Sequence, residues 1–167
     1  MRTYSNDTMT NKEIKINFQE FSSFEELDAS DRTLAEAAVS AQKGSYAPYS
    51  KFNVGAAIRL SNGKIVSGAN QENDAFPSGL CAERTAMFYA NANNPDAAME
   101  EIAIAGGKDG DLCDSPATPC GACRQVMAQY QNKSGRPMGI LMVGSKKIWK
   151  FEKVEDILPL IFDSLKK

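Results

Sequence analysis

The chain has 167 residues, of which 43% are hydrophobic and 24% charged, so it is long enough for one globular domain that buries roughly 70% of its unfolded surface. No apolar run approaches the length of about 18 residues that a membrane span needs, and no basic and then apolar leader begins the chain. The formal net charge is −2 and most lysines are scattered, which disfavours a nucleic-acid partner and favours a small neutral one. The four cysteines fit metal binding in a reducing cytoplasm better than a disulfide framework.

The first 30 residues are expected to form an extension to a domain that occupies residues 31–167. Residues 1–11 are rich in Asn, Thr and Ser, which predicts a disordered start. Ile14, Ile16 and Phe18 then alternate with polar residues, which is the period of a half-buried strand over residues 12–19. Such a strand is either an added edge of the sheet or an arm that contacts a neighbouring subunit.

The domain itself alternates helical and strand-like segments, which predicts an α/β fold. Gly44 ends the first helix, and Asn62-Gly63 is the turn of a β-hairpin. In chain order, the expected elements are a helix over 30–43, strands over 54–60 and 64–69, a helix over 82–92, a strand over 102–106, a helix from 119 to about 134, strands over 138–143 and 148–151, and a short helix from 154.

The last two strands are joined by only four residues, 144–147. A parallel crossover needs a dozen or more residues, so this pair must be antiparallel. We therefore expect a mixed five-stranded sheet, which the N-terminal strand would extend, with the helices that follow Cys81 and Cys120 packed on one of its faces.

Three cysteines form a candidate metal site. Cys120 and Cys123 are three residues apart on the expected helix, and Thr118-Pro119 before them resembles a helix start, with a capping hydroxyl and then proline at the first helical position. The positive end of a helix dipole favours the thiolate form that binds metal. Cys81 offers a third thiolate at the start of another helix.

Zinc suits such sulfur ligands, and a site with three protein ligands keeps one position open for water. The chain has no histidine, which removes the commonest alternative zinc ligand and the commonest general base. Cys113 lies in a polar segment without a motif around it, and it is either a bystander or the fourth ligand of a closed structural site.

Glu83 lies two residues after Cys81, where its carboxylate can reach the open position of the metal without binding the metal itself. Each motif alone is open to another interpretation, because a Cys-x-x-Cys pair can be redox-active or structural and a helical glutamate is usually solvated. The combination of Cys-x-Glu with a later Pro-Cys-x-x-Cys favours catalysis.

These segments resemble the zinc signature of the cytidine deaminase superfamily, in the all-cysteine version of the tetrameric free-nucleoside cytidine deaminases. The similarity extends to Tyr46 through Ala57 and to Asn70 through Asn73, and it runs from about Leu34 to Phe162. It implies a three-layer α-β-α fold, one zinc ion per chain and a homotetramer. Superfamily members that act on polynucleotides or transfer RNA have a helix and a parallel pair in place of the short link at 144–147.

The resemblance assigns a role to each candidate site residue. Cys81, Cys120 and Cys123 would bind zinc, and Glu83 would be the catalytic acid–base; Arg84 and Arg124 would offset the charge of the thiolates; Phe52, Asn70, Glu72, Ala82 and Phe162 would bind substrate. Without the resemblance, Asn70 and Glu72 are equally typical of a polar turn. Phe76-Pro77 and the bulky Leu160-Ile161 before Phe162 depart from the usual family pattern.

The expected reaction is hydrolytic deamination of cytidine, and also of deoxycytidine, in pyrimidine salvage. The alternatives are a deaminase for another cytosine-like substrate, such as a blasticidin-type nucleoside, and a non-catalytic module that zinc stabilises.

Overall fold

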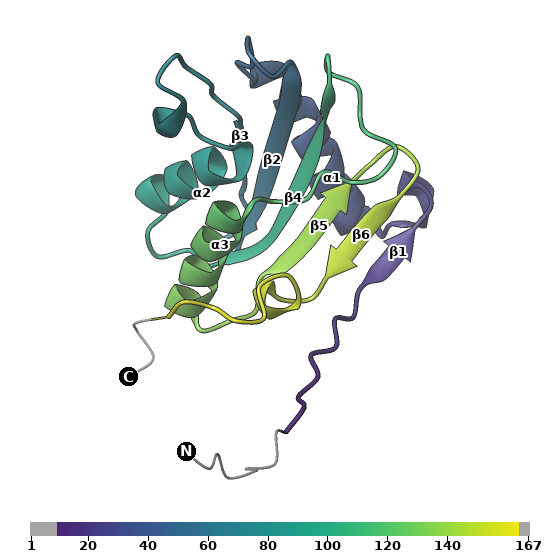
Figure 1. Ribbon diagram of the computed structural model, residues 1–167, viewed down its shortest axis with the longest axis vertical. Helices are drawn as coiled ribbons and strands as arrows, with labels where there is room; N and C mark the ends of the chain where they lie inside the picture. The colour runs from purple at the N-terminus through teal and green to yellow at the C-terminus, as the bar shows by residue number, and fades with distance from the viewer. Residues whose placement is uncertain (1–9, 164–167) are drawn as a thin grey trace, which may run out of the picture.

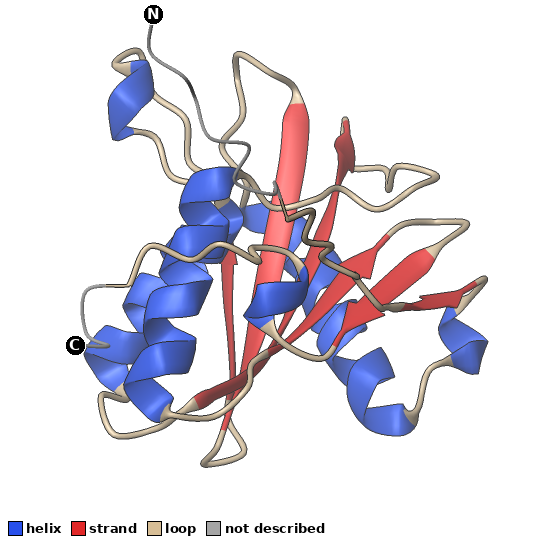
Figure 2. Cartoon of the chain, turned by 60° about the horizontal axis from the view of Figure 1, so that its bottom comes forward, coloured by secondary structure: helices blue, strands red, loops and turns tan. Residues whose placement is uncertain are grey.

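A mixed six-stranded sheet with helices on both faces forms the body of the computed structural model, which describes residues 10–163 (Figures 1 and 2). The strand order is β1-β6-β5-β4-β2-β3, and only β4 and β5 pair in parallel. The strands are β1 (Gln19–Phe21), β2 (Phe52–Leu60), β3 (Ile65–Ala69), β4 (Met99–Lys108), β5 (Gly139–Val143) and β6 (Ile148–Phe151). This confirms the expected fold class, with β1 added to the five predicted core strands.

The two short connections have the geometry that the sequence predicts. β5 and β6 are antiparallel, with Val143 opposite Ile148 on either side of the four-residue link. β2 and β3 form the expected hairpin, and Gly63 in its turn has a φ of 81°, a conformation that glycine adopts without a steric penalty.

Three helices complete the layers: α1 (Ala29–Ala41), α2 (Ala82–Asn93) and α3 (Gly121–Ser134). In Figure 1, α2 and α3 lie together on one face of the sheet and α1 lies on the other. Side chains alternate along β2, so Ala56 packs in the core under α2 and α3, and Ala57 packs in the core under α1. The sheet is therefore apolar on both faces, as a three-layer fold requires.

Two glycines let the helices approach the sheet closely. A Cβ at Gly55 would lie 2.1 Å from the carbonyl oxygen of Ala38 in α1, and a Cβ at Gly68 would lie 2.6 Å from the backbone nitrogen of Ala86 in α2. Any larger residue would push a helix away from the sheet. Gly68 thereby sets the position of α2, which carries Glu83.

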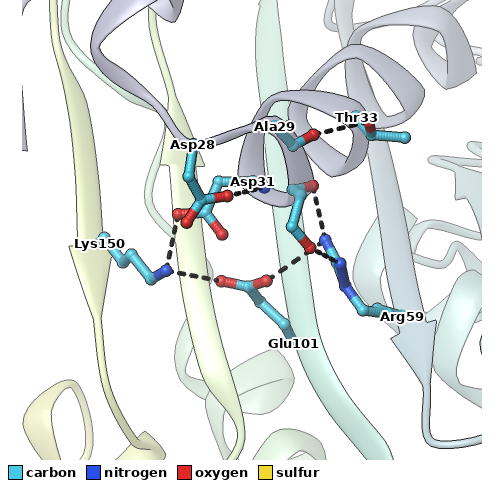
Figure 3. A network of polar contacts seen from close by, with 8 residues as sticks. Asp28, Ala29, Asp31, Thr33, Arg59, Glu101 and Lys150 are labelled. Atoms are coloured by element: carbon cyan, nitrogen blue, oxygen red, sulfur yellow. Dashed lines mark hydrogen bonds and ion pairs between the residues drawn. The ribbon is translucent and has the colours of Figure 1, made fainter.

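A polar network fixes α1 on the face of the sheet that is remote from the cysteines (Figure 3). Lys150 Nζ lies 2.6 Å from Asp31 Oδ2 and 3.6 Å from Glu101 Oε1, and Arg59 joins Glu101 Oε2 at 3.6 Å. Asp28 caps α1, because its carboxylate accepts a hydrogen bond from the backbone of Asp31 at 2.8 Å. Burial raises the pKa of Glu101. The network joins α1 to β2, β4 and β6.

The N-terminal strand lies later in the chain than predicted. The strand lies at Gln19–Phe21, where it pairs with β6, whereas residues 10–18 have no regular secondary structure. Of the alternating apolar side chains, Phe18 packs on Trp149 and Phe151, with ring centroids 5.7 and 5.1 Å apart. Ile14 and Ile16 are exposed, so only Phe18 of the three alternating apolar residues packs against the sheet. The predicted disordered start falls mostly outside the described residues.

The short C-terminal helix predicted from Val154 is a 3-10 helix of three residues, Val154–Asp156, rather than an α-helix. Pro159 explains the difference, since it lacks an amide hydrogen and disfavours helical geometry in Leu158 before it. Among the described helices, none combines the length and the apolar character that crossing a membrane would require.

Candidate metal centre and substrate cavity

The three motif cysteines come together where α2 and α3 begin. Cys81 and Cys120 are the N-cap residues of these helices, and Cys123 lies in the first turn of α3. The Sγ atoms of Cys81 and Cys120 are 3.9 Å apart, and those of Cys120 and Cys123 are 3.5 Å apart. Both helices therefore direct the positive ends of their dipoles at the sulfur cluster.

The group of three fits one zinc ion. Its ligand atoms all lie within 4.8 Å of one another. Tetrahedral zinc with bonds of about 2.3 Å to sulfur places its ligands about 3.8 Å apart, close to the two separations observed here. Cys113 does not belong to this group, so the protein supplies three sulfur ligands rather than the four of a closed structural site.

The thiols are poised for metal binding by their surroundings. A hydrogen bond from Cys123 and the guanidinium of Arg84 lower the pKa of Cys81 to about 5, and Arg84 Nη2 lies 3.6 Å from its sulfur. The hydrogen bond to Cys81 and burial raise the pKa of Cys123. A divalent cation would reverse that rise, because it favours thiolates. Arg84, which the sequence analysis expects to offset the charge of the thiolates, thus lies beside one of the three sulfur atoms.

Glu83 is buried next to the cysteines, with only 4% of its surface exposed. Burial, and then the charge of Cys81, raise the pKa of its carboxyl group, and hydrogen bonds with its own backbone amide and with Cys123 oppose that rise. Among the described residues it is the only buried acid on the face of the sheet that carries the cysteines, since the other buried acid, Asp31, belongs to α1 on the opposite face. A buried carboxyl group beside the sulfur cluster would be able to exchange a proton with a water molecule that a metal ion holds there.

Two details around α3 differ from the sequence prediction. The helix begins after Cys120, so Thr118 and Pro119 precede its N-cap rather than forming it. Arg124 donates from Nε to the carbonyl of Pro119 at 2.9 Å and from Nη1 to that of Ile157 at 2.7 Å. Its guanidinium therefore ties the loop before α3 to the C-terminal segment, and its hydrogen bonds go to carbonyl groups.

A cavity of about 550 Å³ adjoins the cluster at Cys81 and Arg84. Its walls also contain Asn70 and Glu72, so the structure brings two predicted substrate-binding residues to the same cavity as a predicted zinc ligand. The remaining lining residues are Tyr49, Ser50, Gln71, Asn73, Phe76, Gly79 and Leu80. A volume of this size accommodates a small organic molecule such as a nucleoside.

The other three predicted substrate residues do not line this cavity. Ala82 is fully buried in the first turn of α2. Phe52 is half-buried at the start of β2, with its ring against Gly106. Phe162 is 80% exposed, and its carbonyl accepts a hydrogen bond of 2.7 Å from Gln125 on α3. The aromatic ring of Phe162 is thus available to another molecule.

Tyr49 and Ser50 were not among the predicted site residues, although both line the cavity. Their backbone amides and the Ser50 hydroxyl hold Glu72, and the Tyr49 hydroxyl donates to Asp74. Both residues belong to the segment from Tyr46 to Ala57 that resembles the deaminases, and this was the signal that could have identified them.

Residues 28–136 match the sequence profile of the cytidine and deoxycytidylate deaminase zinc-binding region. The chain belongs to this deaminase family. The matched range includes the three cysteines of the sulfur cluster, Glu83 and all the residues that line the cavity. The sequence similarity to the family therefore covers the same part of the molecule as the candidate site.

Individual relatives are similar over much of the chain. The cytidine deaminase of Halalkalibacterium halodurans is 44% identical over 96 residues, which are 58% of this chain and 68% of the relative. That of Sporosarcina psychrophila is 43% identical over 94 residues, 56% of this chain and 65% of the relative. The crystal structure of cytidine deaminase from Burkholderia pseudomallei superposes with a TM-score of 0.66 at 37% identity, covering 78% of this chain and 97% of that one.

Proposed function

We propose that the protein is a cytidine deaminase, which uses zinc to hydrolyse cytidine, and also deoxycytidine, to the uracil nucleoside and ammonia in pyrimidine salvage. The observation that carries this proposal is the placement of buried Glu83 beside a three-sulfur site that adjoins a nucleoside-sized cavity. The similar proteins are named cytidine deaminases, which supports cytidine as the substrate. The antiparallel β5–β6 pair supports a free nucleoside over a polynucleotide.

The chain's own residues account for the binding and the proton transfers. When zinc is bound by Cys81, Cys120 and Cys123, it supplies a water molecule acidic enough to lose a proton near neutral pH. Glu83 would take that proton and deliver it to N3 of the cytosine ring while the water oxygen adds to C4. It would then pass the second proton of the water to the leaving amino group, so that ammonia departs and uridine remains.

An assay of ammonia release tests this function directly. The zinc-loaded protein should release ammonia from cytidine and deoxycytidine, and much more slowly from cytosine, because free cytosine lacks the sugar that Asn70 and Glu72 would bind. Blasticidin and single-stranded DNA are the comparison substrates for the rival deaminase activities. A protein that binds zinc but releases no ammonia from any of these compounds would instead be a non-catalytic zinc-stabilised module.

The carboxylate of Glu72 should contribute strongly to substrate binding. We expect Glu72→Gln to lower kcat/KM for cytidine about tenfold or more, mainly by raising KM, because hydrogen bonds to charged groups are worth roughly 1.5–3 kcal/mol. Steady-state kinetics with cytidine measure the effect, and Glu152→Gln on the exposed turn after β6 is a matched control. Unchanged kinetics in Glu72→Gln would remove this carboxylate from the substrate site.

A homotetramer is the expected assembly, because the sequence resembles tetrameric deaminases and because Phe162 is exposed beside α3. We expect Phe162→Ala to weaken cytidine binding about tenfold while the tetramer still forms, since stacking on a base is typically worth about 1–3 kcal/mol. Sedimentation velocity combined with KM measurements tests both points. A fully active monomer would overturn the tetramer, and an unchanged KM would show that Phe162 does not contact substrate.

A cytoplasmic location follows from the same chemistry. Three thiols that bind metal must stay reduced, and the cytoplasm keeps cysteines in that state.

A further inference from the structure

Among the described residues, the side-chain amide of Asn70 has partners for both lone pairs of its oxygen and for one of its two N–H groups. Its Oδ1 accepts hydrogen bonds from the Val54 backbone at 2.8 Å and from the Ser45 hydroxyl at 2.5 Å. Its Nδ2 donates to the carbonyl of Phe52 at 2.9 Å. Because the Val54 amide can only donate and the Phe52 carbonyl can only accept, the orientation of the Asn70 amide is fixed. One N–H of Nδ2 remains for another molecule.

The carboxylate of Glu72 accepts three hydrogen bonds from Tyr49 and Ser50. Its Oε2 accepts from the backbone amides of Tyr49 and Ser50 at 3.0 and 3.3 Å, and its Oε1 accepts from the Ser50 hydroxyl at 2.5 Å. The Ser50 hydroxyl oxygen itself accepts from the Phe52 amide at 3.1 Å, so its single hydrogen is directed to Glu72. These donors keep the carboxylate ionised, and the pKa of Glu72 is lowered chiefly by the Ser50 hydroxyl.

The two side chains therefore present one donor, on Asn70 Nδ2, and one acceptor position, on Glu72 Oε1. A hydroxyl group both donates and accepts one hydrogen bond, so this pair matches sugar hydroxyl chemistry. The match depends on the hydroxyls of Ser45 and Ser50, which occupy the remaining lone pairs. The backbone supports the same geometry, because Tyr46 N donates to Asn70 O at 3.0 Å and Glu72 N donates to Tyr46 O at 2.8 Å.

We propose that Ser45 and Ser50 are positioning residues, which aim Asn70 and Glu72 at a sugar hydroxyl of the nucleoside. This inference rests on the proposed function. Ser50 should matter more than Ser45, because Asn70 keeps the contacts of Val54 and Phe52 when Ser45 is changed. Within residues 10–163, Oε1 of Glu72 accepts a hydrogen bond from Ser50 alone, and it loses that donor when Ser50 is changed.

The test measures the kinetics of each variant with cytidine and with an analogue that lacks the sugar hydroxyls. Ser50→Ala should lower kcat/KM for cytidine about tenfold, with KM carrying the change and kcat within about twofold, since the lost group is a hydrogen-bond partner of a charged side chain. With 2′,3′-dideoxycytidine, which lacks both hydroxyls, Ser50→Ala and the parent should agree within about twofold. Ser45→Ala should show the same pattern with a loss of about threefold. Ser50→Thr, which keeps the hydroxyl, should restore most of the affinity for cytidine.

Binding measurements separate this inference from the proposed reaction. Calorimetric titration of the zinc-loaded variants with uridine and 2′,3′-dideoxyuridine needs no turnover, and it should give the same hydroxyl-dependent losses. Ser67→Ala on β3, where the serine is exposed and opposite Ala57, is the matched control and should change neither affinity. An equal loss with the dideoxynucleosides, or no loss with uridine and cytidine, would overturn the positioning role. If the serine variants lost affinity only for nucleosides with sugar hydroxyls, but the parent did not deaminate cytidine, the positioning role would stand and the proposed reaction would be refuted.

Discussion

Replacing Glu83 by glutamine should lower kcat for cytidine by about 10⁴-fold or more. General acid–base groups typically contribute about 10²–10⁴-fold, and here one carboxylate would serve two proton transfers in succession. Glutamine keeps the shape of the side chain but carries no transferable proton at neutral pH. The chain has no histidine that could substitute, and Glu83 is the buried acid beside the sulfur cluster.

The Glu83→Gln experiment needs controls for metal content and folding. Zinc content and the unfolding midpoint should match those of the parent, because the sulfur ligands and the core under α2 are untouched. Glu36→Gln is a matched control, since Glu36 is exposed on α1 at the opposite face of the sheet. If Glu83→Gln kept its zinc and deaminated cytidine within tenfold of the parent, the proposed proton carrier would be wrong.

Only part of the metal centre could be predicted from local geometry, because Cys81 lies 39 residues before Cys120 and was joined to it by the resemblance to the deaminase signature. Cys120 and Cys123 are separated by one helical turn, and a cysteine at each helix start determines which end of the helix its sulfur occupies. The link at 144–147 likewise fixes the antiparallel pair by its length alone. Such features depend on spacing within a few residues, which a sequence displays directly.

Contacts between distant segments could not be predicted in the same way. Ser45 and Asn70 are 25 residues apart, and Ser50 and Glu72 are 22 apart, so only the fold brings each pair together. The strand at Gln19–Phe21 is determined by its partner β6 rather than by the alternation before it. In these cases tertiary pairing outweighs local pattern.

Three thiolates should hold the zinc ion, so Cys123→Ala should remove most of the metal and nearly all activity. Cys123 is fully buried between Cys81, Cys120 and Glu83, and its loss leaves two sulfur ligands in place of three. Metal binding stabilises the folded state when the site forms only on folding, so the variant should also unfold at a lower temperature than the zinc-loaded parent. We expect kcat/KM to fall by at least about 10³-fold, since both the acidic water and its orientation depend on the metal.

Cys113→Ala makes the same chemical change outside the cluster, because Cys113 is a half-buried thiol that does not belong to the group of three. It should keep about one zinc ion per chain and the activity of the parent, as three thiolates complete the protein's share of a catalytic site. Elemental analysis counts the zinc, and X-ray absorption should show three sulfur ligands with one lighter atom. A fourth sulfur ligand, or loss of zinc in Cys113→Ala, would show that the centre is a closed structural site. Such a site leaves no position for the water that Glu83 must deprotonate.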